Sequence, residues 1–184
     1  MLKASSQIEV KSIINYGTMN KTSQSVFQRR FLIDILPEPV TRASSHLQIL
    51  DRYIAGTRLR LRQVRVPDTG QYTRMLQQRI MLPNDMEIKL AEVHLDDREY
   101  SLFEPMGRSE VRKNRYFHEF DLVPLAFDVY LGELSGLKLA VAEFEMREEA
   151  EGMTMPEFST HEVTHFPAFL GENLAETSFN DLNL

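Results

Sequence analysis

The chain alternates between apolar and polar residues over eight separate stretches, and this pattern constrains its fold more than any other feature of the sequence. Residues that alternate with a period of two place successive side chains on opposite faces of a β-strand. Turn-forming residues separate the stretches, among them Gly56, Pro67–Gly70 and Gly132–Gly136. The predicted strands are Phe27–Ile35, His46–Ile54, Thr57–Val66, Tyr72–Leu82, Glu87–Leu95, Glu110–Phe120, Leu125–Leu131 and Lys138–Arg147. Eight consecutive strands with few helices between them predict an antiparallel sheet that closes, or nearly closes, into a barrel.

Helical signals are short and lie between or after the strands. The predicted helices are Pro39–Ser45, Asp96–Phe103, Arg147–Gly152 and Phe169–Glu176. Asp96 is the candidate N-cap of the second helix, because a carboxylate there accepts hydrogen bonds from the free N–H groups of the first turn. The predicted fold class is therefore α+β, with a closed eight-stranded antiparallel barrel and a few flanking helices.

The first 25 residues are polar and weakly patterned, so we expect an extension (residues 1–25) ahead of a single barrel domain (residues 26–184). Within the extension, Gln7–Ile14 could add a strand. No apolar run approaches the roughly 20 residues that cross a bilayer, and the N-terminus lacks the apolar core of a signal peptide. We expect a cytoplasmic protein that does not enter membranes.

Composition excludes several classes of site. The chain has no cysteine, so thiolate metal sites and disulfides are absent. The sequence contains neither a glycine-rich phosphate loop nor a nucleophile elbow, and its five histidines lack metal-binding spacing. A net charge of −6 argues against general or specific binding of nucleic acid.

Charge is distributed very unevenly along the chain. Residues 1–116 hold 19 of the 21 Lys and Arg against 13 Asp and Glu, whereas residues 117–184 hold 2 against 14. A fold that brings these parts together would set a cationic lining beside a group of carboxylates. Polyphosphate chemistry with a divalent metal uses both kinds of group. Simple attraction between two oppositely charged surfaces would explain the same distribution.

The segment Thr57–Arg62 reads T-R-L-R-L-R, which places Arg58, Arg60 and Arg62 on one face of a strand. Guanidinium groups held this close repel one another unless an anion lies between them, and their planar donors suit phosphate oxygens. A solvated outer face of an ordinary sheet would show the same pattern.

Similar polar faces recur on other predicted strands. Arg79 shares a face with Gln77, Lys113 shares one with Arg115, and Glu143 shares one with Glu145. The opposite faces carry enough large apolar residues to pack against other segments. Either an outward polar surface or a polar interior with an apolar exterior satisfies this pattern.

With its strands in this order, the chain resembles the CYTH superfamily, also called the triphosphate tunnel metalloenzymes. The resemblance covers about residues 26–175. The segments that carry it are Q-R-R-F-L-I at Gln28–Ile33, G-T-R-L-R-L-R at Gly56–Arg62, K-N-R-Y at Lys113–Tyr116, F-D-V-Y at Phe127–Tyr130, G-L-K-L-A-V-A-E-F-E at Gly136–Glu145, and E-V-T at Glu162–Thr164.

The resemblance implies a closed eight-stranded tunnel in which basic side chains grip a triphosphate and acidic ones hold Mg²⁺ or Mn²⁺. Family activities include inorganic triphosphatase, thiamine triphosphatase, RNA triphosphatase and a class of adenylate cyclase. By resemblance, the substrate-binding residues are Arg30, Arg58, Arg60, Arg62, Arg79, Lys113 and Arg115. Glu143 and Glu145 would be catalytic by holding the metal, with Asp128 as a further ligand. The implied partner is a small molecule that contains a triphosphate.

The chain departs from the family pattern on the first tunnel strand. The name-giving E-x-E-x-K appears here as Val26-x-Gln28-x-Arg30, so both carboxylates are missing. Upstream, Glu9-x-Lys11 matches only the last part of the E-x-E-x-K motif. Three functions stay open: a metal-dependent triphosphatase, a binding module for a phosphorylated ligand that has lost hydrolysis, or a structural partner protein.

Overall fold

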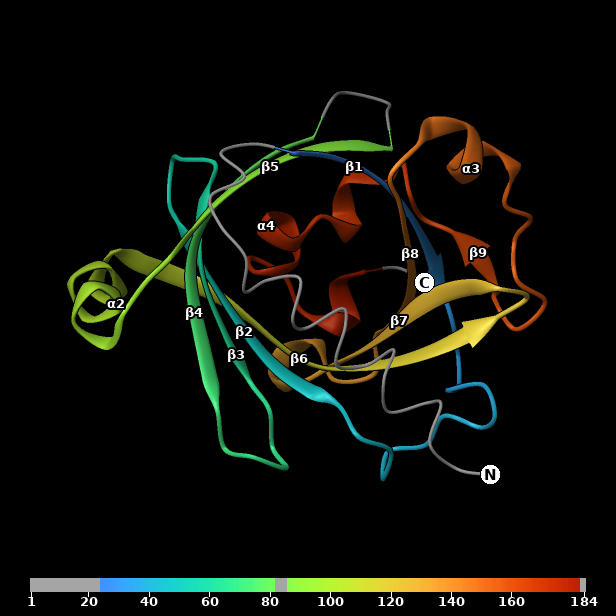
Figure 1. Cartoon of the computed structure of the whole chain (residues 1–184), viewed down its shortest axis with the longest axis horizontal. Coiled ribbons are helices and arrows are strands. Elements are labelled where there is room, and N and C mark those ends of the chain that lie inside the picture. The colour runs from blue at the N-terminus through green and yellow to red at the C-terminus, as the bar shows by residue number, and fades with distance from the viewer. Residues whose placement is uncertain (1–23, 82–85, 183–184) are drawn as a thin grey trace.

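The computed structural model describes residues 24–81 and 86–182, and its main element is a closed antiparallel barrel (Figure 1). Strands β1 to β8 form the barrel in the order β1–β8–β7–β6–β2–β3–β4–β5, and β5 returns to pair with β1. A short β9 pairs with β1 beyond the end of β5. The strands are β1 Gln24–Leu32, β2 Leu47–Ile54, β3 Leu59–Arg65, β4 Tyr72–Met81, β5 Glu87–His94, β6 Gly107–Phe120, β7 Val123–Tyr130, β8 Lys138–Phe144 and β9 His161–Glu162. The predicted fold class is confirmed.

The described α-helices are short: α2 Asp97–Phe103, α3 Arg147–Gly152 and α4 Gly171–Leu174. Single 3₁₀ turns occur at Glu104–Met106, Gly132–Leu134, Pro167–Phe169 and Phe179–Asp181. The predicted N-cap of α2 is confirmed: Asp96 Oδ1 accepts a hydrogen bond from the Glu99 N–H at 2.7 Å, and Glu99 Oε2 accepts one from the Asp96 N–H at 2.9 Å. These two bonds form a capping box.

Two helix predictions need correction. Pro39–Ser45 forms turns rather than a helix. There the Ser44 hydroxyl accepts from the Thr41 N–H and the Thr41 hydroxyl accepts from the Ala43 N–H, so side chains take the backbone donors that a helix would use. The predicted helix at Phe169–Glu176 is reduced to a 3₁₀ turn followed by the four residues of α4.

The outer face of β1, β7 and β8 is apolar and covered by other segments. Phe31, Phe127 and Ala140 are fully buried there, and Met153 and Phe158 from the segment after α3 pack against this cluster. Alternation along the strands therefore turns the opposite, more polar side chains of the same strands toward the barrel interior.

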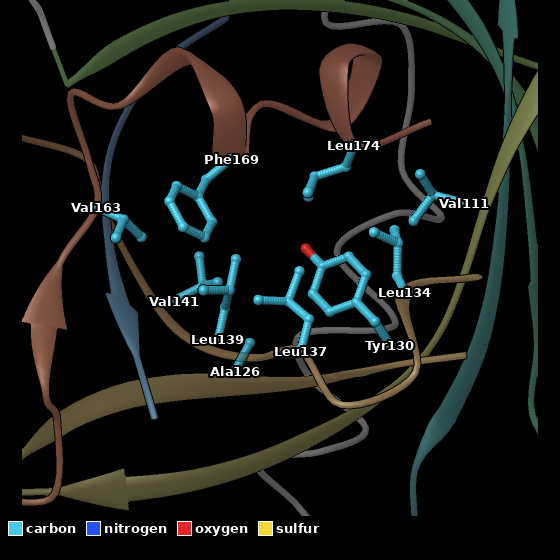
Figure 2. Close-up of a cluster of buried hydrophobic side chains, with 10 residues drawn as sticks. All are labelled: Val111, Ala126, Tyr130, Leu134, Leu137, Leu139, Val141, Val163, Phe169 and Leu174. Carbon is cyan, nitrogen blue, oxygen red and sulfur yellow. The ribbon is translucent and has the colours of Figure 1, made fainter. Parts of the chain in front are cut away.

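The C-terminal segment, residues 163–182, fills part of that interior. In Figure 1, α4 lies within the ring of strands. Figure 2 shows Phe169 and Leu174 directed toward Leu139 and Tyr130, and all four belong to one buried apolar cluster. The interior is thus divided between an apolar part, packed against the C-terminal segment, and a charged part.

Most of the predicted N-terminal extension, including Gln7–Ile14, lies outside the described residues, and Gln24 and Ser25 open β1. Leu82, the predicted end of the fourth strand, also lies outside them. In the part of the chain that the structure describes, none of the helices has the length and apolar character needed to traverse a bilayer.

Candidate functional site

A cavity of about 100 Å³ lies in the charged part of the barrel interior. Side chains from β1 to β8 line it, together with residues of the C-terminal segment. The cationic residues that line it, among those described, are Arg30, Arg60, Arg62, Arg79, Lys113 and Arg115. The carboxylates are Asp51, Asp128 and Glu143. Cationic groups therefore outnumber carboxylates by three in the described lining.

Asp51 on β2 is clamped by two arginines of β3. Arg62 lies opposite it in the strand register and donates from Nε and Nη2 to the two carboxylate oxygens, both at 2.6 Å. Arg60 Nη1 adds a bond of 3.3 Å to Oδ2. Burial alone would raise the pKa of Asp51, but the two guanidinium groups outweigh it and hold the pKa well below the usual range. Asp51 is thus a permanent counter-ion.

Asp128 on β7 is clamped in the same way by two residues of β6. Lys113 Nζ donates to Oδ2 at 2.6 Å, and Arg115 donates from Nε to Oδ1 at 2.6 Å and from Nη2 to Oδ2 at 2.8 Å. Burial opposes ionisation of Asp128, yet the two cations lower its pKa well below the usual range. Burial lowers the pKa of Lys113 to about 7, against the opposing effect of Asp128.

Arg79 on β4 has no such partner among the described residues. Its guanidinium donates no hydrogen bond to a described carboxylate or carbonyl. It shares the cavity with Arg60 and Arg62, which repel it, and with Glu143, which attracts it without direct contact. Burial, followed by repulsion from these two arginines, lowers the pKa of Arg79 to about 10. An arginine remains charged at neutral pH, so this cation is held in a place that favours a bound anion.

Arg30 on β1 is engaged by the C-terminal segment. Its Nη1 donates to the Phe169 carbonyl at 2.7 Å and its Nη2 donates to the Thr164 carbonyl at 2.6 Å. Gly171, two residues after Phe169, lies close to Tyr53. A Cβ atom added at this glycine would be 1.9 Å from the tyrosine hydroxyl oxygen. These contacts place the C-terminal segment against the cavity and close one part of its wall.

Gln28 and Glu143 face each other across β1 and β8. They are register partners, and Gln28 Nε2 donates to Glu143 Oε1 at 2.7 Å. Val26, the next residue on the same face of β1, also lines the cavity. The two positions that the resemblance aligns with glutamates thus present an apolar side chain and a neutral amide.

The residues predicted to hold a metal do not converge on one. Glu145 lies beyond the end of β8, is exposed, and does not line the cavity. Asp128 is saturated by Lys113 and Arg115, which leaves Glu143 alone. Within residues 24–81 and 86–182, no three His, Asp or Glu side chains come close enough to share an ion. This donor set does not fit Mg²⁺ or Mn²⁺, which take several oxygen ligands.

The predicted phosphate-binding residues are brought together with one exception. Arg58 is exposed in the turn before β3 and does not line the cavity. The strand begins only at Leu59, because the turn at Gly56, whose φ is +72°, extends through Arg58. Glu162, in the last matching segment, forms an outer ion pair with Arg29 at 2.6 Å and so ties β9 to β1.

Asp51, Tyr53 and Gln77 line the cavity and were not predicted. Gln77 accepts a hydrogen bond from Arg60 Nε at 2.8 Å. Asp51 and Tyr53 alternate on one face of a predicted strand, and that face could have been flagged as polar. Their position opposite the arginines depends on strand register, which the sequence does not state.

Comparison with solved structures supports the fold. The crystal structure of the inorganic triphosphatase NE1496 is 21% identical, with a TM-score of 0.56, over 82% of this chain and 93% of its own. A second structure, of "the hypothetical protein NE1496", is 19% identical with a TM-score of 0.57, over 83% of this chain and 99% of its own. No family model and no curated protein matches the chain. The closed barrel expected from the resemblance to the CYTH superfamily is therefore confirmed as a fold.

Proposed function

We propose that the cavity binds the phosphate chain of a small triphosphate compound, such as inorganic triphosphate, a nucleoside triphosphate or thiamine triphosphate. The observation that carries this proposal is the excess of three cations over carboxylates in the described lining, with Arg79 left without an anionic contact there. Buried positive charge of this kind is costly unless an anion arrives to neutralise it. The side chains that bind the phosphate oxygens are Arg60, Arg62, Arg79, Lys113 and Arg115.

Each further phosphate offers oxygens to further cations. A hydrogen bond to a charged group contributes about 1.5–3 kcal/mol net, so affinity should rise from monophosphate to diphosphate to triphosphate. Isothermal titration calorimetry with these three inorganic anions tests the proposal, and binding should weaken as salt is added. Equal affinity for all three anions, or no binding at all, would contradict it.

Hydrolysis of the bound triphosphate is a second candidate function. It is favoured by the barrel shared with a protein described as an inorganic triphosphatase. The metal-ligand set described above argues that hydrolysis is slow or absent here. Phosphate release should be measured with Mg²⁺ and with Mn²⁺, in the natural protein and in the double variant Val26→Glu with Gln28→Glu.

We expect the natural protein to fall below the ordinary enzyme range of about 1–10³ s⁻¹ and the double variant to be faster. Glu143→Ala should then abolish the activity of the double variant while phosphate binding persists. Turnover of the natural protein within that range would instead make it a working triphosphatase.

A further inference from the structure

We propose that the cavity binds its polyphosphate as the free anion, without a divalent cation, so that Mg²⁺ weakens the complex instead of strengthening it. This inference rests on the function proposed above and adds the ionic form of the ligand to it. Three features of the described lining carry it: the Gln28–Glu143 pair, the closed carboxylate clamps, and the charge balance.

The Gln28–Glu143 pair satisfies itself without a metal. Two carboxylates facing each other at 2.7 Å would repel and would need a cation or a proton between them. Here one partner is an amide, whose N–H donates to Glu143 Oε1 at that distance. Val26, which also lines the cavity, contributes no donor atom. The pair therefore lacks the electrostatic demand for a divalent ion.

The other two carboxylates of the lining are already neutralised. Asp51 is bound by Arg60 and Arg62, and Asp128 by Lys113 and Arg115, with every carboxylate oxygen accepting at least one charged donor. A metal that used either group would have to displace cations from a buried site. That exchange leaves those cations unpaired, which is costly.

The remaining charge suits an anion that comes without a metal. The described lining has six basic side chains and three carboxylates, so the ligand meets a surplus of three positive charges once Lys113, whose pKa burial lowers to about 7, is protonated. A phosphate group contributes roughly one to two negative charges near neutral pH, so a triphosphate brings roughly three to six, enough to neutralise this surplus without a metal. Mg²⁺ bound to the same anion removes two of its negative charges and occupies oxygens that the arginines would bind.

The experiment is a pair of calorimetric titrations of the whole protein with inorganic triphosphate, one in EDTA and one in excess Mg²⁺. We expect triphosphate to bind about tenfold more weakly in Mg²⁺, the loss of roughly one charged contact. Mg²⁺ titrated alone should give no binding heat. Binding that needs Mg²⁺, or that tightens in it, overturns the inference and leaves the proposed function standing. Absence of binding in both conditions overturns the proposed function itself.

The variant Gln28→Glu sharpens the test, because it creates the facing pair of carboxylates. This variant should bind Mg²⁺ in the absence of triphosphate. The effect of Mg²⁺ on its triphosphate affinity should also be reversed, so that Mg²⁺ strengthens the binding. The matched control is Gln63→Glu, which makes the same change of charge on β3 outside the cavity, where Arg74 Nε donates to the side chain at 3.2 Å. The control should behave like the natural protein. If both variants respond to Mg²⁺ alike, the Gln28–Glu143 pair is not the determinant and the inference fails.

Discussion

Replacing Arg79 should stabilise the empty barrel and weaken its ligand binding. Arg79 shares a cavity with Arg60 and Arg62, and among the described residues no carboxylate contacts it. The substitution Arg79→Met removes the charge and keeps an unbranched side chain of similar reach in the barrel wall. Arg79 is half-buried, and a charge enclosed without a partner is costly, so its replacement by an apolar side chain should be neutral or stabilising.

The magnitude follows from the lowered pKa of Arg79. That pKa is about 10 in the folded protein. Each pKa unit corresponds to about 1.4 kcal/mol, and an arginine ordinarily titrates above about 12, so keeping Arg79 charged costs the empty protein at most about 3 kcal/mol. Partial hydration and the loss of packing reduce the net gain, and we expect Arg79→Met to raise the free energy of unfolding by about 1–2 kcal/mol. Affinity for triphosphate should fall by about 1.5–3 kcal/mol.

Two measurements are needed together, namely denaturant unfolding of the ligand-free protein and calorimetric titration with triphosphate. The control is Arg58→Met, because Arg58 is exposed in the turn before β3 and does not line the cavity. This control should leave both quantities within about 0.5 kcal/mol of the natural protein. Destabilisation of the empty protein by Arg79→Met, or unchanged affinity, would refute the reasoning.

Three further predictions concern the groups around the cavity. At pH 8, triphosphate binding should take up a proton, because an anion raises the pKa of Lys113 from about 7, and affinity should fall as the pH rises past 7. Calorimetric titrations in buffers of different ionisation enthalpy measure this proton uptake. The uptake should be absent in Lys113→Arg. Gly171→Ala should lower the free energy of unfolding by about 1–3 kcal/mol, because the new methyl group overlaps the Tyr53 hydroxyl, and thermal unfolding measures this loss. Adding Tyr53→Phe should restore part of the lost stability. The control Gly152→Ala, whose methyl group meets no atom within 4 Å, should leave the stability unchanged. Asp51→Asn should cost about 3–5 kcal/mol in denaturant unfolding, because it leaves two buried arginines without their counter-ion; a loss below 1 kcal/mol would contradict this role.

The order and type of the strands could be predicted because each follows from local pattern. Alternation identified all eight barrel strands, and turn residues such as Gly56 and Gly132, both with positive φ, separated them. Strand ends were less accurate. β6 begins at Gly107, three residues before the predicted start, because pairing with β2 continues past an irregularity at Tyr53 and Ile54. Tertiary pairing, which the sequence does not state, decides such ends.

The cationic side of the site could also be predicted, but its internal neutralisation could not. A shared strand face was enough to group Arg60 with Arg62 and Lys113 with Arg115. The clamp on Asp51 needs the register between β2 and β3, and the clamp on Asp128 needs the register between β6 and β7. Without these registers, the sequence could not show that Asp128, a predicted metal ligand, lies in a closed ion cluster with Lys113 and Arg115.

The position of the C-terminal segment shows a further limit of sequence pattern. Phe169 and Leu174 look like ordinary core residues, and nothing local indicates that they enter a barrel otherwise lined by charge. Arg30, which the resemblance assigned to phosphate, donates to the carbonyls of Thr164 and Phe169, and the sequence pattern does not indicate that contact either.

Taken together, these contacts explain how six cations can line one cavity in a stable fold. Asp51 and Asp128 each neutralise a pair of cations, and the backbone carbonyls of the C-terminal segment satisfy Arg30. Such pairing limits the electrostatic cost of an empty interior, because five of the six cations have a close counter-charge or dipole. Arg79 lies outside this scheme among the described residues, so the attraction available to a ligand is concentrated at β4. The contact with Arg79 should therefore contribute most to the binding energy of an anion in the cavity. The cations paired with Asp51 and Asp128 should contribute less.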